Sequence, residues 1–233
     1  MSNLENISIG KQTETINVEV WSDVVCPFCY IGKRNFENAL KQTGLTDVIN
    51  VVWRSFELAP DVQPNPEATI YEELGKRKGW SLEQSKQIHG QMEQRAKESG
   101  LKFDFNLTVP ANSFNAHRLL HLAGKHGVQS EVKESLFKGY FTDGENIDDE
   151  NFLIETGRKA GISEEEVRNA LQSDVIENEV FGDIEYARKL GINGVPFFVL
   201  NQKYALSGAQ PVDLFMEALE KASGEMNLEA QHE

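Results

Sequence analysis

The sequence predicts an α/β fold with a large helical insertion, and three observations support this prediction. Segments with the composition of β-strands stand near the two ends of the chain of 233 residues. Between them lie more than a hundred residues whose apolar side chains have helical spacing. The chain's two cysteines stand where the first strand-like segment gives way to a helical pattern. The expected order is therefore β-α-β, helical insertion, β-β-α.

The first predicted unit is a βαβ segment. Residues 16–22, INVEVWS, alternate apolar and other side chains, which is typical of a strand. From Ile31 to Leu40 apolar side chains recur at helical spacing, and Gly44 ends this predicted helix. Residues 48–58 are rich in β-branched and aromatic side chains, which favours a second strand. The connection is long enough for parallel pairing of the two strands.

A proline-dotted stretch at 59–69 separates this unit from the helical region. Capping patterns predict helix starts at Ser81, Ser163 and Asp174, because each is followed three residues later by Glu or Gln. No repeat of fixed period stands out.

After Leu190 the sequence returns to strand patterns. A short strand is predicted at Phe197–Leu200 and another around Tyr204–Leu206, and Pro211 opens a last amphipathic helix. The predicted units are a flexible N-terminus at 1–14, an α/β domain formed by 15–66 and 191–222, an inserted helical domain at 67–190 and a flexible C-terminus at 223–233.

Composition and charge exclude several classes of partner. The net charge of −14 disfavours nucleic acid and anionic membrane surfaces. No apolar run approaches the ~18 residues that a membrane span needs. The first fifteen residues lack the basic start and apolar core of a secretory signal. We therefore expect a cytoplasmic protein.

Cys26 and Cys29, in VCPFCYIGK, fit a metal site, a structural disulfide or a redox centre. A structural zinc site needs four ligands, and the spacing of His117 and His121 matches no usual zinc pattern, so no metal is expected. A disulfide that closes so short a loop would stabilise the fold weakly, and a reducing compartment would disfavour it. The redox centre is the favoured interpretation.

The position of the pair indicates how such a centre would work. The N-terminus of a helix favours a thiolate, so we expect the pKa of Cys26 to fall below the usual ~8.5, with Pro27 in the first helical turn. Cys26 would attack, and the more buried Cys29 would resolve the mixed disulfide. A charged Asp23 nearby would act against this pKa shift. Asp23 and Glu57 are candidate proton acceptors for Cys29, or else solvated or helix-capping acids.

A second fragment, GVPFFVL, contains a proline at a predicted strand start. A cis Val195–Pro196 peptide packed against Cys26 would let the backbone pair with a substrate strand held for exchange. The alternative is a trans proline that simply begins a strand.

Four segments in this order, VWSDVVCPFCYIGKRNFE, NSFNAHRLLHLAG, GYFTDGENI and GVPFFVLNQKYALSGAQ, resemble the DsbA-like thioredoxin-fold oxidoreductases, most closely their cytoplasmic FrnE-like branch. The resemblance runs from about Ile16 to Leu219. It implies a thioredoxin fold, a central mixed sheet flanked by helices, interrupted by an all-helical domain. It further implies Cys26 as nucleophile, Cys29 as resolving cysteine and Pro196 as the cis-proline beside them.

The implied activity is cytoplasmic thiol-disulfide exchange, as a reductase or isomerase acting on proteins or small thiols. The residues expected to contact substrate are Pro27, Phe28, Val195 and Pro196. Phe28 replaces the Trp often seen between the family cysteines. No cofactor is expected beyond the cysteine pair, although glutathione is a candidate co-substrate. A homodimer stays open.

Two other functions stay open at this point. The first is a glutathione-dependent isomerase or transferase, similar to the kappa-class transferases and hydroxychromene-carboxylate isomerases. The second is a non-enzymatic, chaperone-like module whose helical insertion forms an apolar groove. Its candidate lining residues, which would otherwise be core, are Phe103, Phe105, Phe114, Phe137, Tyr140 and Phe141.

Overall fold

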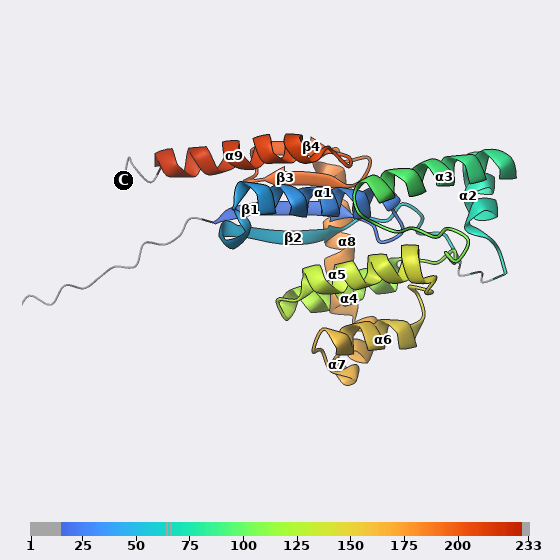
Figure 1. Ribbon diagram of the computed structural model, residues 1–233. Coiled ribbons are helices and arrows are strands. Elements are labelled where there is room, and N and C mark those ends of the chain that lie inside the picture. Colours follow the sequence, from blue (N-terminus) through green and yellow to red (C-terminus); the bar gives the residue numbers. More distant parts are fainter. Residues whose placement is uncertain (1–14, 64, 66, 230–233) are drawn as a thin grey trace, which may run out of the picture.

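The computed structural model describes residues 15–63, 65 and 67–229. In these residues a four-stranded sheet carries helices on both faces, and a helical insertion extends to one side (Figure 1). The elements in chain order are β1 (Ile16–Ser22), α1 (Pro27–Thr43), a 3-10 turn η1 (Thr46–Val48), β2 (Ile49–Ser55), α2 (Ile70–Lys78), α3 (Leu82–Glu98), α4 (Phe114–Lys125), α5 (Gln129–Lys138), a π-helical turn η2 (Gly139–Asp143), α6 (Glu150–Lys159), α7 (Glu164–Leu171), α8 (Asp174–Lys189), β3 (Phe197–Leu200), β4 (Tyr204–Ser207) and α9 (Val212–Glu229).

The sheet is mixed, in the order β2-β1-β3-β4. Strand β1 pairs in parallel with β2, which places Ile16 beside Ile49. It pairs antiparallel with β3, which places Val20 beside Phe198. The predicted thioredoxin-like sheet is therefore confirmed, and β1 delivers the cysteine loop from its centre.

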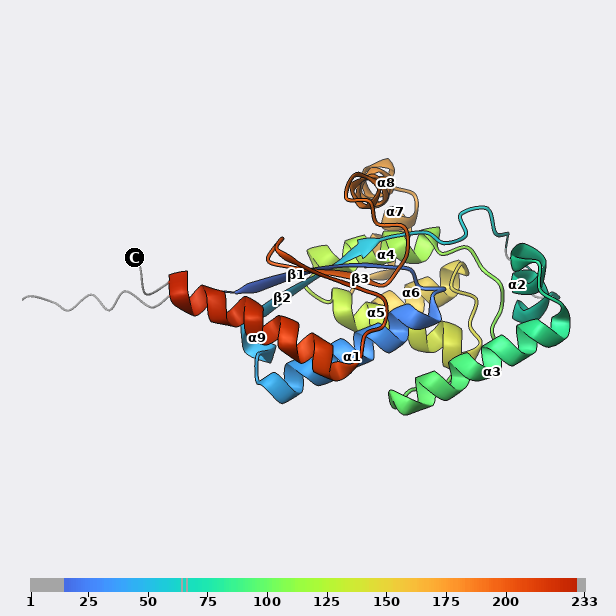
Figure 2. The same ribbon diagram turned by 90° about the horizontal axis from the view of Figure 1, so that it is seen from above.

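Helices cover both faces of this sheet, as Figure 2 shows from above. Helices α1 and α9 pack together on one face, where Phe36 and Phe215 meet the inward side chain of Phe198. Helix α8 covers the other face, where Trp21 packs edge-on against Tyr186. Side chains of β1 therefore pack into an apolar core on each face of the sheet: Val18 and Val20 on one face and Trp21 on the other.

The insertion between β2 and β3 contains helices α2 to α8, and it packs against α1 and β2. Helices α4, α5 and α8 contact the edge strand β2, and α3 contacts α1 (Figure 1). The Tyr30 ring of α1 stacks on Phe137 of α5 with centroids 4.8 Å apart. One apolar cluster consequently runs from the cysteines into the insertion.

The second strand, predicted at 48–58, is the shorter β2 (Ile49–Ser55), and Val48 belongs to the turn η1. Ser81 and Ser163 form capping boxes as expected, but α8 is capped by Ser173, whose hydroxyl accepts from the Ile176 N–H, and Asp174 is its first residue. Helix α9 continues to Glu229, so it includes residues 223–229 of the segment that we expected to be a flexible C-terminus. The predicted flexible segment 1–14 and residues 230–233 lie outside the described residues.

Most of the aromatic residues proposed to line a groove in the insertion belong to its core. Of the six candidate lining residues all but Phe114 are buried, and Phe114 is half-buried against Phe181. The groove that a chaperone-like module would need is therefore not built from these residues. Within the described part of the chain, no helix is both long and apolar enough to cross a membrane.

Candidate active site

The cysteines lie at the junction of β1 and α1, as the sequence predicts. Cys26 is the N-cap residue of α1 with extended backbone angles, and Pro27 occupies the first turn. The Cys29 N–H donates to the Cys26 carbonyl at 3.0 Å. Cys29 is fully buried and Cys26 is only 3% exposed. The first helical turn therefore holds both sulfurs at the edge of the interior.

The tertiary fold brings the Val195–Pro196 peptide to Cys26, 169 residues earlier in the chain. This peptide is cis, as expected. The Cys26 thiol donates to the Val195 carbonyl with a sulfur–oxygen distance of 3.6 Å. On the next turn of α1, a Cβ added at Gly32 would lie 2.9 Å from Cγ of Pro196. A glycine at position 32 thus allows the proline to seat against α1.

Asp23 is a fully buried carboxylate in the loop before Cys26. It accepts a hydrogen bond from the Leu58 N–H at 2.7 Å, and its Oδ1 lies 3.4 Å from Nε2 of His117. Burial raises the pKa of Asp23, but His117 and the Leu58 N–H outweigh burial, so the pKa is lowered. Burial dominates at His117 and lowers its pKa. At neutral pH the pair is therefore a carboxylate beside an uncharged imidazole.

Glu57, the second candidate proton acceptor, is half-buried after β2. Burial and the charge of Asp23 raise its pKa to about 7. Within the described residues no hydrogen bond joins Glu57 to either cysteine. It can exchange protons near neutral pH, and its role as an acceptor for Cys29 stays a prediction.

The environment of Cys26 overturns the expected direction of its pKa. The hydrogen bond with Cys29, burial and the negative charges of Cys29 and Asp23 raise the pKa of Cys26 well above its ordinary value. A backbone contact at Cys29 acts the other way and is outweighed. The helix N-terminus alone favours a thiolate, but burial of the two thiols beside a carboxylate outweighs this local effect.

A groove of about 480 Å³ lies beside the cysteine loop. Phe28 and Val195, both predicted to contact substrate, line it, together with Arg95 and Glu98 of α3. The Arg95 guanidinium lies 5.2 Å from the centroid of the Phe28 ring. The residue between the cysteines thus forms part of the groove wall.

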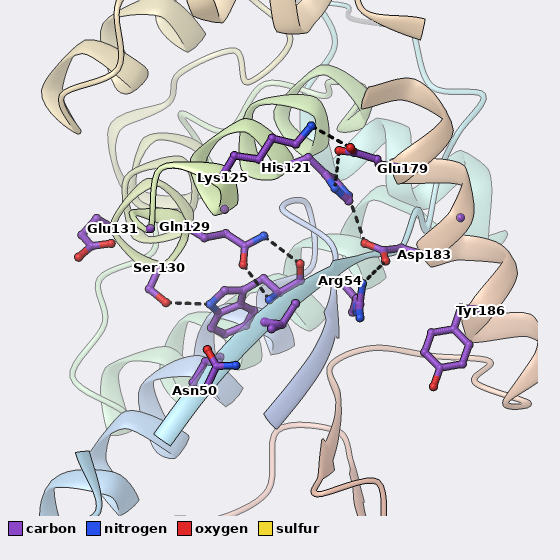
Figure 3. A pocket seen from close by; sticks show the side chains of 16 residues that line it. Asn50, Arg54, His121, Lys125, Gln129, Ser130, Glu131, Glu179, Asp183 and Tyr186 are labelled. Carbon is purple, nitrogen blue, oxygen red and sulfur yellow. Dashed lines mark hydrogen bonds and ion pairs between the residues drawn. The ribbon is translucent and has the colours of Figure 1, made fainter. Parts of the chain in front are cut away.

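A larger hollow of about 820 Å³ lies elsewhere, along the edge strand β2 and helices α4 and α8 (Figure 3). Neither cysteine lines either cavity, but the smaller groove is lined by Phe28, which stands between the cysteines, and by Val195, whose carbonyl contacts Cys26, whereas the larger hollow contains neither residue. Its polar side chains mostly bond to one another, as Lys125 with Glu179 and Arg54 with Asp183 (Figure 3). The smaller groove, which adjoins the cysteine loop, is therefore the better candidate for substrate.

Two residues near the cysteines escaped the sequence analysis. His117 appeared there only as a zinc candidate, and nothing in the sequence pairs it with Asp23. Lys133 is fully buried, and both cysteines act on its charge. The sequence does contain a sign that Lys133 is buried, because Lys133 lies on the same apolar face of α5 as Val132, Leu136 and Phe137.

Comparisons with known proteins agree with this geometry. A family model described as a DSBA-like thioredoxin domain matches residues 17–220. A probable DsbA oxidoreductase from Streptomyces coelicolor is 38% identical, with a TM-score of 0.82 over 90% of this chain and 91% of that one.

Two more distant structures share the fold. Cytosolic disulfide reductase DsbM from Pseudomonas aeruginosa, solved with GSH, is 18% identical, with a TM-score of 0.65 over 88% of this chain and 98% of that one. A 2-hydroxychromene-2-carboxylate isomerase is 17% identical, with a TM-score of 0.64 over 93% of this chain and 98% of that one.

Proposed function

Since the chain belongs to the DSBA-like thioredoxin domain family and is a thiol-disulfide oxidoreductase, we propose that Cys26 and Cys29 carry out its exchange reaction. Cys26 is the nucleophile, Cys29 is the resolving cysteine, and the substrates are protein or small-thiol disulfides. The proposed direction is reduction or isomerisation in the cytoplasm, where thiols are kept reduced.

The exchange takes place in two steps. The Cys26 thiolate attacks one sulfur of the substrate disulfide, so a mixed disulfide forms, the substrate bond breaks and the departing thiolate takes a proton. Cys29 then loses its proton and attacks the Cys26 sulfur, which releases the second substrate thiol. Two electrons pass from the dithiol to the substrate, and the Cys26–Cys29 disulfide remains.

The observation that carries this proposal is the contact between the Cys26 thiol and the Val195 carbonyl at the groove. This contact supports Phe28 and Val195 as the residues that hold a substrate beside the Cys26 sulfur, while Cys29 is fully buried. The fold shared with a cytosolic disulfide reductase solved with GSH supports the proposed location and glutathione as a co-substrate.

The test is single-cysteine substitution with an exchange assay and mass spectrometry. We expect Cys26→Ser to abolish reduction of a model disulfide peptide. Cys29→Ser should still react once and then accumulate a mixed disulfide on Cys26. Exchange that survives in Cys26→Ser would overturn the proposal.

The same variants separate the rival isomerase. If Cys29→Ser keeps full turnover whenever glutathione is present, one cysteine suffices. The glutathione-dependent isomerase, of which a representative shares the fold, then becomes the better assignment.

A further inference from the structure

A buried lysine, on whose charge both cysteines act, lies on helix α5. The Lys133 side chain is completely buried, which is rare for lysine unless its charge is paired. The other buried lysine in this region, Lys33, is paired: its Nζ lies 2.6 Å from carboxylate oxygens of both Glu37 and Glu134. Among the described residues none gives Nζ of Lys133 a hydrogen bond.

Packing places this amine between aromatic rings of α5 and of strand β2. Its Nζ lies 5.0 Å from the centroid of the Phe137 ring and 5.7 Å from that of Trp53. The Phe137 ring stacks on Tyr30, the residue that follows Cys29. The aromatic rings solvate the amine weakly, so its charge is left to act on the polar groups nearby.

The ionisable groups facing Lys133 come from three elements. Cys29, Asp23 and Cys26, on α1 and the loop before it, favour its charged form, with Cys29 first among them. Lys33 of α1 disfavours that form, and Lys133 in turn lowers the pKa of His117 on α4. Burial is the largest influence and lowers the pKa of Lys133 to about 8.

We propose that Lys133 is a positioning residue for the exchange reaction, whose ammonium group stabilises the thiolate that forms on buried Cys29 before it attacks the mixed disulfide. This inference rests on the proposed function of the cysteine pair. A thiolate at Cys29 has no contact with solvent, so its negative charge needs a compensating group within the protein. Lys133 supplies the opposing positive charge and is not consumed, because Cys29 gives up its proton and sulfur–sulfur exchange then proceeds as above.

The first test follows both steps with a chromogenic aromatic disulfide added to reduced protein. Attack by Cys26 releases one coloured thiol, and resolution by Cys29 releases the second. Lys133→Met replaces the lysine with an apolar side chain of similar length. We expect the second release to slow about tenfold at neutral pH and to recover at alkaline pH, as for a rise of about one unit in the pKa that governs resolution.

The matched control is Lys138→Met, which removes the same charge from an exposed position on α5 paired with Asp143. It should keep the wild-type pH profile. A profile of Lys133→Met that coincides with wild type, or a rate reduced equally at every pH, would assign Lys133 a structural role only. Failure of the wild-type protein to release two thiols would instead refute the dithiol mechanism itself.

A second measurement needs no substitution and decides the matter if Lys133→Met does not fold. Lysine side-chain NMR of the unmodified protein gives the pKa of Lys133 in the reduced and the oxidised form. We expect a higher pKa in the reduced form, because a thiolate favours the ammonium and the disulfide carries no charge. Equal values in the two forms would overturn the proposal.

Discussion

At the scale of single residues, the buried charge of Asp23 acts on several neighbours. The hydrogen bond with Cys29 and burial raise the pKa of Cys26, and burial raises the pKa of Glu57 and Tyr140. The charge of Asp23 has a weaker effect in the same direction on all three. The charge is retained because the Leu58 N–H and His117 offset the cost of burial. One carboxylate three residues before the nucleophile therefore contributes to the raised pKa of three neighbouring groups.

The raised pKa of Glu57 predicts a stability difference that depends on pH. Folding raises this pKa from 4.5 to about 7, so the folded protein keeps a proton that the unfolded chain has lost. The stabilisation is present below the unfolded value and is lost as the pH rises through about 7. We expect Glu57→Gln to be more stable than wild type at pH ~8 by about 1–2 kcal/mol, discounted for partial exposure, and to lose this advantage near pH ~5.

Urea denaturation of both proteins across this pH range measures the difference. Glu72→Gln is the control, because hydrogen bonds from the backbone and side chain of Thr69 lower the pKa of Glu72. Its effect should run in the opposite direction, with a loss of stability that fades as the pH falls. If the difference in stability between Glu57→Gln and wild type does not change with pH, the raised pKa of Glu57 is contradicted.

At the scale of elements, α1 links the chemistry to the fold. It begins with Cys26 as N-cap and Pro27 in its first turn, and it ends at Gly44, whose φ of 69° suits glycine. Between these ends its apolar face packs on the sheet, and Gly32 faces Pro196. The helix therefore fixes the distance between the sulfurs and the cis-proline loop.

The close approach at Gly32 predicts that alanine there will be harmful. The added methyl group would overlap Pro196, so the proline must move away from α1. We expect Gly32→Ala to lower the free energy of unfolding by about 1–3 kcal/mol and to slow the attack step of exchange.

The control is Gly90→Ala on α3, where an added Cβ meets nothing within 4 Å. This change should gain up to ~1 kcal/mol, because alanine is the better helix former. Thermal melts and the two-phase release assay check both variants. If Gly32→Ala has the same stability and attack rate as wild type, the loop with Pro196 accommodates the added methyl group and the prediction is wrong.

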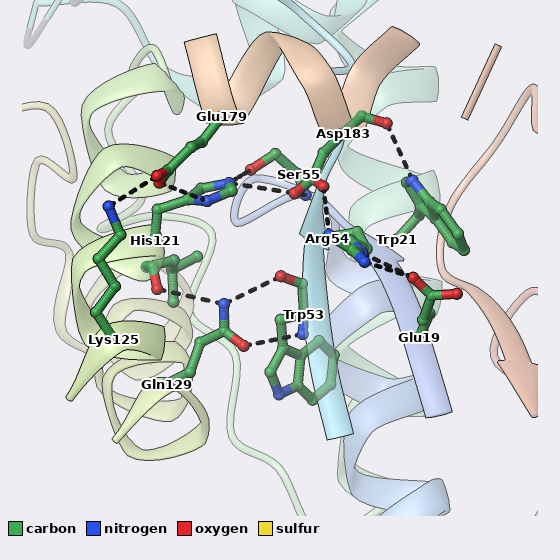
Figure 4. Close-up of polar contacts among 11 residues, drawn as sticks. Glu19, Trp21, Trp53, Arg54, Ser55, His121, Lys125, Gln129, Glu179 and Asp183 are labelled. Carbon is green, nitrogen blue, oxygen red and sulfur yellow. Dashed lines mark hydrogen bonds and ion pairs between the residues drawn. The ribbon is translucent and has the colours of Figure 1, made fainter. Parts of the chain in front are cut away.

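At the scale of the whole molecule, polar side chains join the insertion to the edge of the sheet (Figure 4). The Gln129 amide donates to the Trp53 carbonyl and accepts from its N–H, as a neighbouring strand would. Asp183 accepts from the Ser55 N–H at 2.9 Å and from Arg54 at 3.0 Å, and lies 3.1 Å from Nε2 of His121. These contacts cover an edge strand that would otherwise be open for pairing.

Loss of Asp183 should therefore loosen the insertion from the sheet. Asp183→Ala leaves the buried Ser55 N–H without an acceptor and Arg54 with Glu19 alone as its partner. We expect a loss of about 2–4 kcal/mol in urea denaturation, with faster hydrogen exchange in β2. Asp143→Ala, which removes an exposed partner of Lys138, should cost less than ~1 kcal/mol. Similar losses in the two variants would show that the network does not bind the insertion.

The sequence by itself determined the elements around the site and the place of the cysteines in them. Strands β1 and β3 and the end of α1 at Gly44 follow from side-chain alternation, helical spacing and a glycine stop, all of which are local. The boundaries of the two predicted domains and the homodimer stay predictions.

Only the tertiary structure decided the electrostatics of the site. The direction of the Cys26 pKa shift, the pairing of Asp23 with His117 and the burial of Lys133 depend on residues brought together from α1, α4 and α5. Such energies depend on distance and on exclusion of water, and neither quantity is written in the spacing of residues along a chain.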